Sequence, residues 1–83
     1  MKENKKDPEE RITVDPKILA GKPVVKGTRI PVYVILEAIE AGQTVEEITK
    51  NYPDLDEKDV KAAIRYATEI VKRGEVRNRE AVT

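Results

Sequence analysis

The side chains that form most zinc sites and nucleophilic pairs are missing from this sequence. The 83-residue chain contains no His and no Cys, and it also contains no Ser. Zinc sites need Cys or His ligands, Ser–His and Cys–His pairs cannot form, and the usual acid–base group at neutral pH is absent. We therefore expect a non-enzymatic protein with no catalytic residue, no metal and no cofactor.

Carboxylates remain as possible acid–base groups, but their spacing does not suit catalysis. Glu46 and Glu47 are adjacent, so on a helix they point to different sides and cannot form a facing pair. Glu47 also stands three residues after Thr44, which is the capping-box pattern of a helix start. The structural role therefore explains Glu47 better than a catalytic one.

Basic side chains are the other candidates, and they are unevenly distributed although the net charge is zero. Residues 22–29 hold three basic and no acidic residues, residues 30–59 hold two basic and eight acidic, and residues 60–83 hold six basic and three acidic. Because attraction to phosphates supplies most non-specific affinity for nucleic acids, a DNA-binding surface should come from the basic segments. The candidates are Lys22, Lys26, Arg29, Lys58, Lys61 and Arg65.

The hydrophobic pattern predicts a mainly α domain over residues 11–73 with a short β-hairpin or paired strands at its N-terminus. Strands are expected at 11–14 and 23–26, and helices at about 31–41, 45–52 and 57–73, which makes a three-helix bundle. The polar segments 1–10 and 74–83 are expected to be a disordered tail and a loose tail. Whether the strands pair within one subunit or between two stays open.

The segment 44–73 has the pattern of a helix–turn–helix unit: a short capped helix, a tight turn and a longer helix. In DNA-binding proteins the second helix enters the major groove. One face of the predicted helix 57–73 is apolar and the opposite face is basic. The apolar residues are Val60, Ala63, Ile64, Ala67, Ile70 and Val71, and the basic ones are Lys58, Lys61, Arg65 and Lys72.

Two observations favour a purely structural interpretation of these features. Paired helices with a tight turn occur in many small helical domains, and the helix start is crowded with carboxylates that repel phosphate, namely Asp54, Asp56, Glu57 and Asp59. The basic segment 21–29 is either an arm that holds the DNA backbone or a structural hairpin. It lacks the Lys that a phosphate-binding loop requires after its second Gly.

A small domain without disulfides or metals buries limited surface, so a homodimer or higher homo-oligomer is expected. The predicted helix 31–41 is apolar on more than one face, and the surplus could contact a second subunit. The N-terminal residues contain no apolar stretch, and no segment is long enough to span a membrane. A cytoplasmic protein without a small-molecule substrate is the expectation.

The runs Ile12-Thr13-Val14-Asp15-Pro16, Gly21 to Val32 (GKPVVKGTRIPV), Ala41-Gly42 and Tyr52-Pro53, together with Leu55, closely resemble the family known as domain of unknown function 433. The resemblance covers roughly residues 11–72. It implies a homeodomain-like helix–turn–helix fold, and many members resemble VapB-type antitoxins paired with a PIN-like ribonuclease toxin. It therefore implies a DNA-binding regulator of a toxin–antitoxin pair, with Arg77 and Arg79 of the C-terminal segment as toxin-binding candidates.

The alternative function is a protein–protein interaction module that does not bind DNA. The acidic residues of the middle of the chain would then form its working surface, namely Glu37, Glu40, Glu46, Glu47 and Asp54.

Overall fold

The computed structural model describes residues 11–74, and in this range the chain is mainly helical. The element order is β1 (Ile12–Thr13), a short 3-10 turn η1 (Leu19–Gly21), β2 (Val24–Val25), α2 (Val32–Glu40), α3 (Val45–Asn51) and α4 (Glu57–Arg73). The predicted arrangement of three helices with two paired strands at the N-terminal side is confirmed. No helix among these residues is long and apolar enough to cross a membrane. The predictions for residues 1–10 and 75–83 lie outside the described residues.

The two strands form a short antiparallel ribbon within one chain. Ile12 lies opposite Val25, and Thr13 lies opposite Val24. The strands are two residues long, which is shorter than the four residues predicted for each. The ribbon continues into α2, because Val24 also forms an isolated bridge with Pro31. The pairing within the chain answers the question that the sequence left open.

The helices begin and end where their capping residues predict. The Thr44 hydroxyl accepts a hydrogen bond from the backbone N–H of Glu47 at 3.1 Å, and the Glu47 carboxylate accepts one from the Thr44 N–H at 2.8 Å. Asp56 and Asp59 form the same reciprocal box at the start of α4. Gly74 ends α4 in the left-handed region with φ of 73°, which glycine adopts without a steric penalty. Local capping thus fixes the bounds of α3 and α4.

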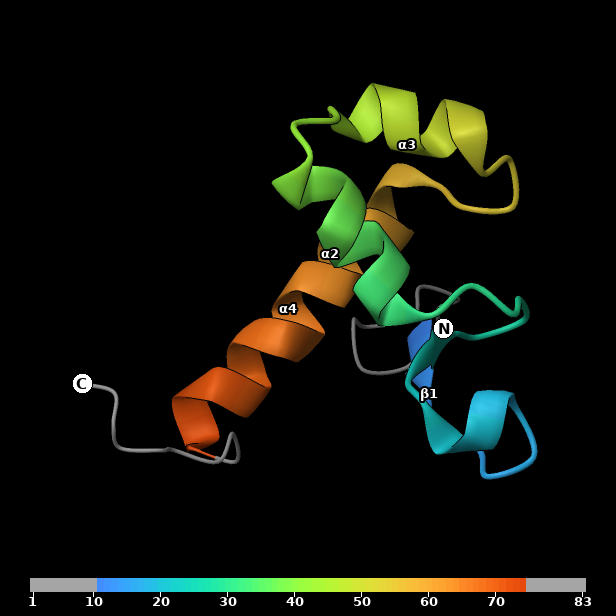
Figure 1. Cartoon of the computed structure of the whole chain (residues 1–83), viewed down its shortest axis with the longest axis vertical. Coiled ribbons are helices and arrows are strands. Elements are labelled where there is room, and N and C mark those ends of the chain that lie inside the picture. The colour runs from blue at the N-terminus through green and yellow to red at the C-terminus, as the bar shows by residue number, and fades with distance from the viewer. Residues whose placement is uncertain (1–10, 75–83) are drawn as a thin grey trace, which may run out of the picture.

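The core lies where α2, α3 and the ribbon meet the first half of α4. Figure 1 shows α2 crossing α4 with α3 across one end of the pair. The largest fully buried side chains are contributed by all these elements except β1: Ile35, Ile48, Val24, Val25 and Val60. Since each strand and helix contributes few core residues, contacts between the elements are needed to hold the fold together.

The predicted apolar stripe of α4 is correct in its first half and wrong in part of the remainder. Val60 and Ala63 are buried as expected, but Ile64 is 41% exposed and Val71 is 66% exposed. Ala62, which was not predicted to face the core, is only 1% exposed. The physical reason is visible in Figure 1, where the last turns of α4 extend beyond the other helices and have none of them alongside.

One ion pair joins the ribbon to the helices. Arg11, which precedes β1, places its Nη1 atom 2.8 Å from Oδ1 of Asp59, in the first turn of α4, and 3.5 Å from Oδ1 of Asp56, the N-cap of that helix. The side chains of Arg11 and Asp59 are only 17% and 12% exposed. A charged hydrogen bond at such low exposure is stronger than a surface pair and is costly to break on one side.

We predict that Arg11→Met destabilises the domain by about 1–3 kcal/mol, because the Asp59 carboxylate is then left largely buried without its cation. The free energy of unfolding is measured by urea denaturation followed by circular dichroism. The urea midpoint of the variant should fall. Its circular dichroism spectrum without urea should stay that of the wild type.

The matched control is Lys61→Met, which also removes one cation from an ion pair with an acidic residue of α4. Lys61 and Glu57 are 3.6 Å apart and 71% and 66% exposed, and such exposed helix pairs contribute only about 0.3–0.5 kcal/mol. Equal effects of the two substitutions would contradict the role assigned to Arg11.

Candidate nucleic-acid interface

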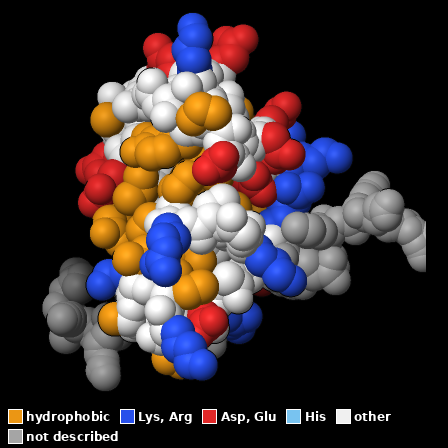
Figure 2. Space-filling view, turned by 90° about the vertical axis from the view of Figure 1, so that its right-hand side faces the viewer, with side chains coloured by type: hydrophobic (Ala, Val, Ile, Leu, Met, Phe, Trp, Pro, Cys, Tyr) orange, Lys and Arg blue, Asp and Glu red, His pale blue; other side chains and the backbone are white. Residues whose placement is uncertain are grey.

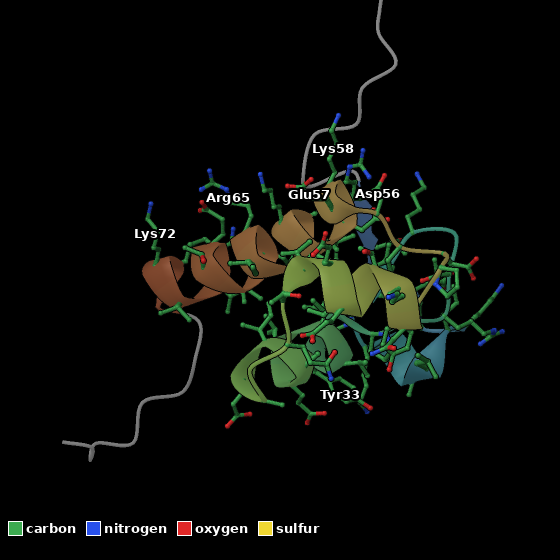
Figure 3. The ribbon with its side chains drawn as sticks, turned by 90° about the horizontal axis from the view of Figure 1, so that it is seen from above. Tyr33, Asp56, Glu57, Lys58, Arg65 and Lys72 are labelled. Carbon is green, nitrogen blue, oxygen red and sulfur yellow. The ribbon has the colours of Figure 1, made fainter. Side chains whose placement is uncertain are left out.

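Four cations lie along one exposed face of α4. Lys58, Lys61, Arg65 and Lys72 follow one another at intervals of three, four and seven residues, and such intervals return to the same side of a helix. All four are exposed. Figure 3 shows Lys58, Arg65 and Lys72 pointing to the same side of the molecule, opposite Tyr33 on α2. We call these four residues the basic stripe.

Two carboxylates of the same helix accompany the basic stripe. Lys61 Nζ lies 3.6 Å from Glu57, and Arg65 Nη1 lies 3.0 Å from Glu69, each one helical turn away. Lys58 and Lys72 form no ion pair with any residue in the range 11–74. The stripe therefore keeps a positive excess of two charges over Glu57 and Glu69, and two of its cations are free to bind an external anion.

Two of the acidic residues at the start of α4 form hydrogen bonds and ion pairs within the protein. Asp59 is buried, accepts a hydrogen bond from the backbone N–H of Asp56 at 3.0 Å and pairs with Arg11. Asp56 accepts a hydrogen bond from the backbone N–H of Asp59 at 2.9 Å and also faces Arg11. The repulsion of phosphate expected from this cluster is thus reduced, because Arg11 supplies a positive charge to two of its four members.

These contacts also affect the ionisation of Asp56. Its carboxyl pKa lies below the ordinary value, chiefly because the charged form accepts the hydrogen bond from the Asp59 N–H, with further help from the Arg11 guanidinium. Partial burial opposes this shift. These contacts at the start of α4 therefore stabilise the ionised form of Asp56 in the folded protein.

The three cations of the GKPVVKGTR segment flank β2 rather than joining the basic stripe directly. Lys22, Lys26 and Arg29 are all exposed, and their side chains form no hydrogen bond or ion pair within residues 11–74. The backbone N–H of Lys26 donates to the carbonyl of Arg11 at 2.7 Å. Because the Arg11 side chain reaches the first turn of α4, the backbone of the ribbon at Lys26 is held near the N-terminal end of that helix.

The conspicuous Gly27-Thr28-Arg29 run is built as a turn. Gly27 has φ of +85°, which is a conformation that glycine favours. The Thr28 hydroxyl donates to the Val25 carbonyl at 2.7 Å and accepts from the Ile30 N–H at 3.0 Å. The Gly and Thr thus shape the connection from β2 to α2, and Arg29 is presented on its exposed side.

Sequence reasoning missed Arg11, which is the residue that links the two basic regions. Its partner Asp59 is 48 positions away, so no local pattern could pair them. The available signal was the surplus of carboxylates at the start of α4, which indicates that one of them has a cation from elsewhere.

Charge is unevenly distributed over the face drawn in Figure 2. Figure 2 shows the acidic side chains mainly in the upper part of the molecule, where α3 lies, whereas Lys and Arg predominate lower down. A band of hydrophobic side chains runs down the same face. The predicted toxin-binding residues Arg77 and Arg79 lie outside the described residues.

Residues 12–67 match the family model described as "Protein of unknown function (DUF433)", which is well over half of the chain. This chain belongs to the DUF433 family. The matched range begins at β1 and ends within α4, so it contains the ribbon, the GKPVVKGTR segment and most of the basic stripe.

Relatives of this DUF433 chain extend over different lengths. An uncharacterized protein, y4eO, from Sinorhizobium fredii is 43% identical over 58 residues, which is 70% of this chain and 26% of that protein. An uncharacterized protein from Archaeoglobus fulgidus is 70% identical over 23 residues, which is 28% of this chain and 64% of that protein. The chain thus spans about a quarter of the first relative and under two thirds of the second.

The crystal structure of a DUF433 member protein from Anabaena variabilis is similar in fold. It has a TM-score of 0.69 and 28% sequence identity, with coverage of 78% of this chain and 64% of the other. The two chains therefore share their fold over the part that aligns.

We predict that the stability of the domain falls as the pH decreases below about 5 and that Asp56→Asn flattens this dependence. A carboxyl whose pKa is lower in the folded state stabilises it above its unfolded pKa of about 3.9, and this contribution is lost as the pH falls through the folded value. Asn preserves the helix cap but cannot titrate. Urea denaturation from neutral to acidic pH measures both proteins, and parallel curves would contradict the assignment.

Proposed function

We propose that this DUF433 chain is a DNA-binding regulator of the antitoxin type, which contacts DNA through the basic stripe of α4. The observation that carries the proposal is the spacing of Lys58, Lys61, Arg65 and Lys72, which lie on one exposed face of α4, the helix that follows α3.

The dimensions and charges of α4 suit a DNA groove. At 1.5 Å per residue, the stretch from Lys58 to Lys72 is about 21 Å long, and a major groove about 12 Å wide admits one helix. The ion pairs of Lys61 and Arg65 are exposed, at 71% and 56% for the two cations. Exchanging such pairs for phosphates therefore meets little resistance.

The ribbon supplies a second basic element at the start of the same helix. Lys22, Lys26 and Arg29 have no internal partners among residues 11–74. Arg11, whose carbonyl accepts a hydrogen bond from the Lys26 N–H, ties the ribbon to the first turn of α4. An arm of this kind contacts the DNA backbone while a helix reads the groove.

The toxin-binding half of the proposal is supported by the family resemblance. A PIN-like ribonuclease has an acidic active site, and Arg77 and Arg79 would form charge-assisted hydrogen bonds with its carboxylates. The partner is best sought in the product of the neighbouring gene.

We predict that reversing two charges of the stripe, with Lys58→Glu and Lys61→Glu together, weakens DNA binding by roughly tenfold or more and lowers the salt slope by about two. Binding to the promoter of its own gene is measured by gel shift over a range of salt concentrations. Phosphate contacts release counterions, so fewer contacts give a shallower dependence.

The matched control reverses Lys17 and Lys50, which are exposed and lie outside both basic regions. This variant carries the same net charge as the stripe variant, so it should retain nearly all binding if location matters. A wild-type protein without sequence preference or salt dependence would remove the DNA-binding proposal.

A second candidate function is a protein-binding module, and the outer face of α2 favours it. Tyr33 is 46% exposed and shares its helix face with Glu37 and Glu40, since these positions are four and seven residues further on. Exposed aromatic side chains are enriched in protein interfaces. The acidic residues Glu46, Glu47 and Asp54 would extend this surface.

Replacing Arg77 and Arg79 by Glu tests toxin binding separately from DNA binding. We predict that this variant loses co-purification with the product of the neighbouring gene and retains its promoter binding, because the substitutions lie outside the stripe. If the partner is instead lost on reversing Glu37 and Glu40 to Lys, the acidic surface of the second candidate function is the binding site.

A further inference from the structure

The second half of α4 carries an apolar face that no other described element covers. Val60, Ala62 and Ala63 belong to the core, and Tyr66 is the last residue of the helix that packs against it. The helix nevertheless continues to Arg73, and Figure 1 shows these turns extending away from α2 and α3. Ile64 and Val71 remain 41% and 66% exposed there.

These apolar residues are arranged as a contact surface for another helix. Ile64, Ala67 and Val71 follow at intervals of three and four residues, which is the spacing of a helix–helix seam, and Ile70 borders it. We call these four residues the α4 seam. The seam contains no charged side chain, and the basic stripe occupies the neighbouring arc of the same helix.

We infer that the α4 seam is covered by the α4 seam of a second copy of this chain, in a two-fold symmetric dimer. Segments of this chain outside the described range offer little to cover it. Residues 1–10 contain Met1 as their one large apolar residue, and residues 75–83 are nine residues of which four are charged.

The order of residues in the seam is self-complementary. Ala67 is small and stands at its centre, with Ile64 three residues before it and Ile70 three residues after it. If two copies cross antiparallel at Ala67, the small side chains permit close approach of the helices. Ile64 of each copy then lies against Ile70 and Val71 of the other. A two-fold axis produces both contacts from one geometry.

The symmetry has a consequence for the basic stripes. A two-fold axis perpendicular to both helices does not reverse directions that are parallel to it. Side chains that point along the axis therefore point to the same side of the dimer in both copies. The stripes of the two copies would therefore lie on one common surface. The dimer does not depend on DNA binding, and a monomer could still bind DNA through one stripe.

The size of the seam sets the strength of the dimer. A face formed by half of one helix is smaller than the roughly 800 Å² that each partner buries in a standard interface. We therefore expect dimerisation that depends on protein concentration rather than a permanent dimer.

The first test is the mass of the full chain in solution by sedimentation equilibrium. The wild type should rise from 9.4 kDa toward twice that mass with concentration. Val71→Glu should stay at the monomer mass, because it places a charge in the seam. Val45→Glu is the matched control, since Val45 is 37% exposed at the start of α3, and it should behave as the wild type.

The second test uses the absence of cysteine from the chain. Ala67→Cys should form a disulfide-linked dimer under mild oxidation, because the two Cα atoms at the crossing fall within bonding reach. Tyr33→Cys, on the opposite side of the molecule from the basic stripe, should not cross-link at a comparable rate.

A wild type that is monomeric at every concentration, with no Ala67→Cys cross-link, would overturn the inference. Equal cross-linking by Tyr33→Cys would move the interface to another surface and also overturn it. A full chain that is monomeric, beside a chain ending at Gly74 that dimerises, would show that the C-terminal segment covers the seam instead. None of these outcomes changes the prediction for promoter binding by the basic stripe.

Discussion

The ion pair between Arg11 and Asp59 is the constraint on which the rest of the arrangement depends. The ribbon has only two residues in each strand, and isolated hairpins of this kind are marginal in water. Arg11 fastens it to the first turn of α4 at 2.8 Å, while Asp59 also completes the capping box of that turn. One carboxylate therefore starts the helix and holds the ribbon, and it does so at the end of α4 where DNA-binding helices meet the groove.

The surface of α4 has three parts with different roles. Its first half buries Val60 and Ala63 in the core, its outer arc carries the basic stripe, and the apolar arc of its second half is the α4 seam. Helical periodicity separates these surfaces, because positions three and four residues apart share a side whereas adjacent positions do not. The neutral net charge of the chain is thus compatible with a locally positive surface, since seven of the ten carboxylates among residues 11–74 lie on α2, α3 and the connecting segments.

Much of the fold could be predicted from the sequence, because its strongest signals are local. The boxes at Thr44 and Asp56 and the stop at Gly74 define α3 and α4 closely, and the spacing of the lysines places the basic stripe on one face. The exposure of Ile64 and Val71 could not be predicted, since it depends on where α2 ends relative to α4 in space. The Arg11–Asp59 ion pair could not be predicted from the sequence either, because the two residues are 48 positions apart and neither differs in the sequence from an ordinary surface charge.

We propose that the basic stripe and the cations of the ribbon both contact DNA, although they are separate on the surface of the protein, and mapping by NMR tests this proposal most directly. Backbone amide shifts of the full chain are followed while a duplex from its own promoter is added. We expect the largest shift changes at residues 58–72 and 22–29, and we expect the amide shifts of α2 around Tyr33 to stay unchanged. Changes confined to α2 and α3, or no changes at all, would contradict it.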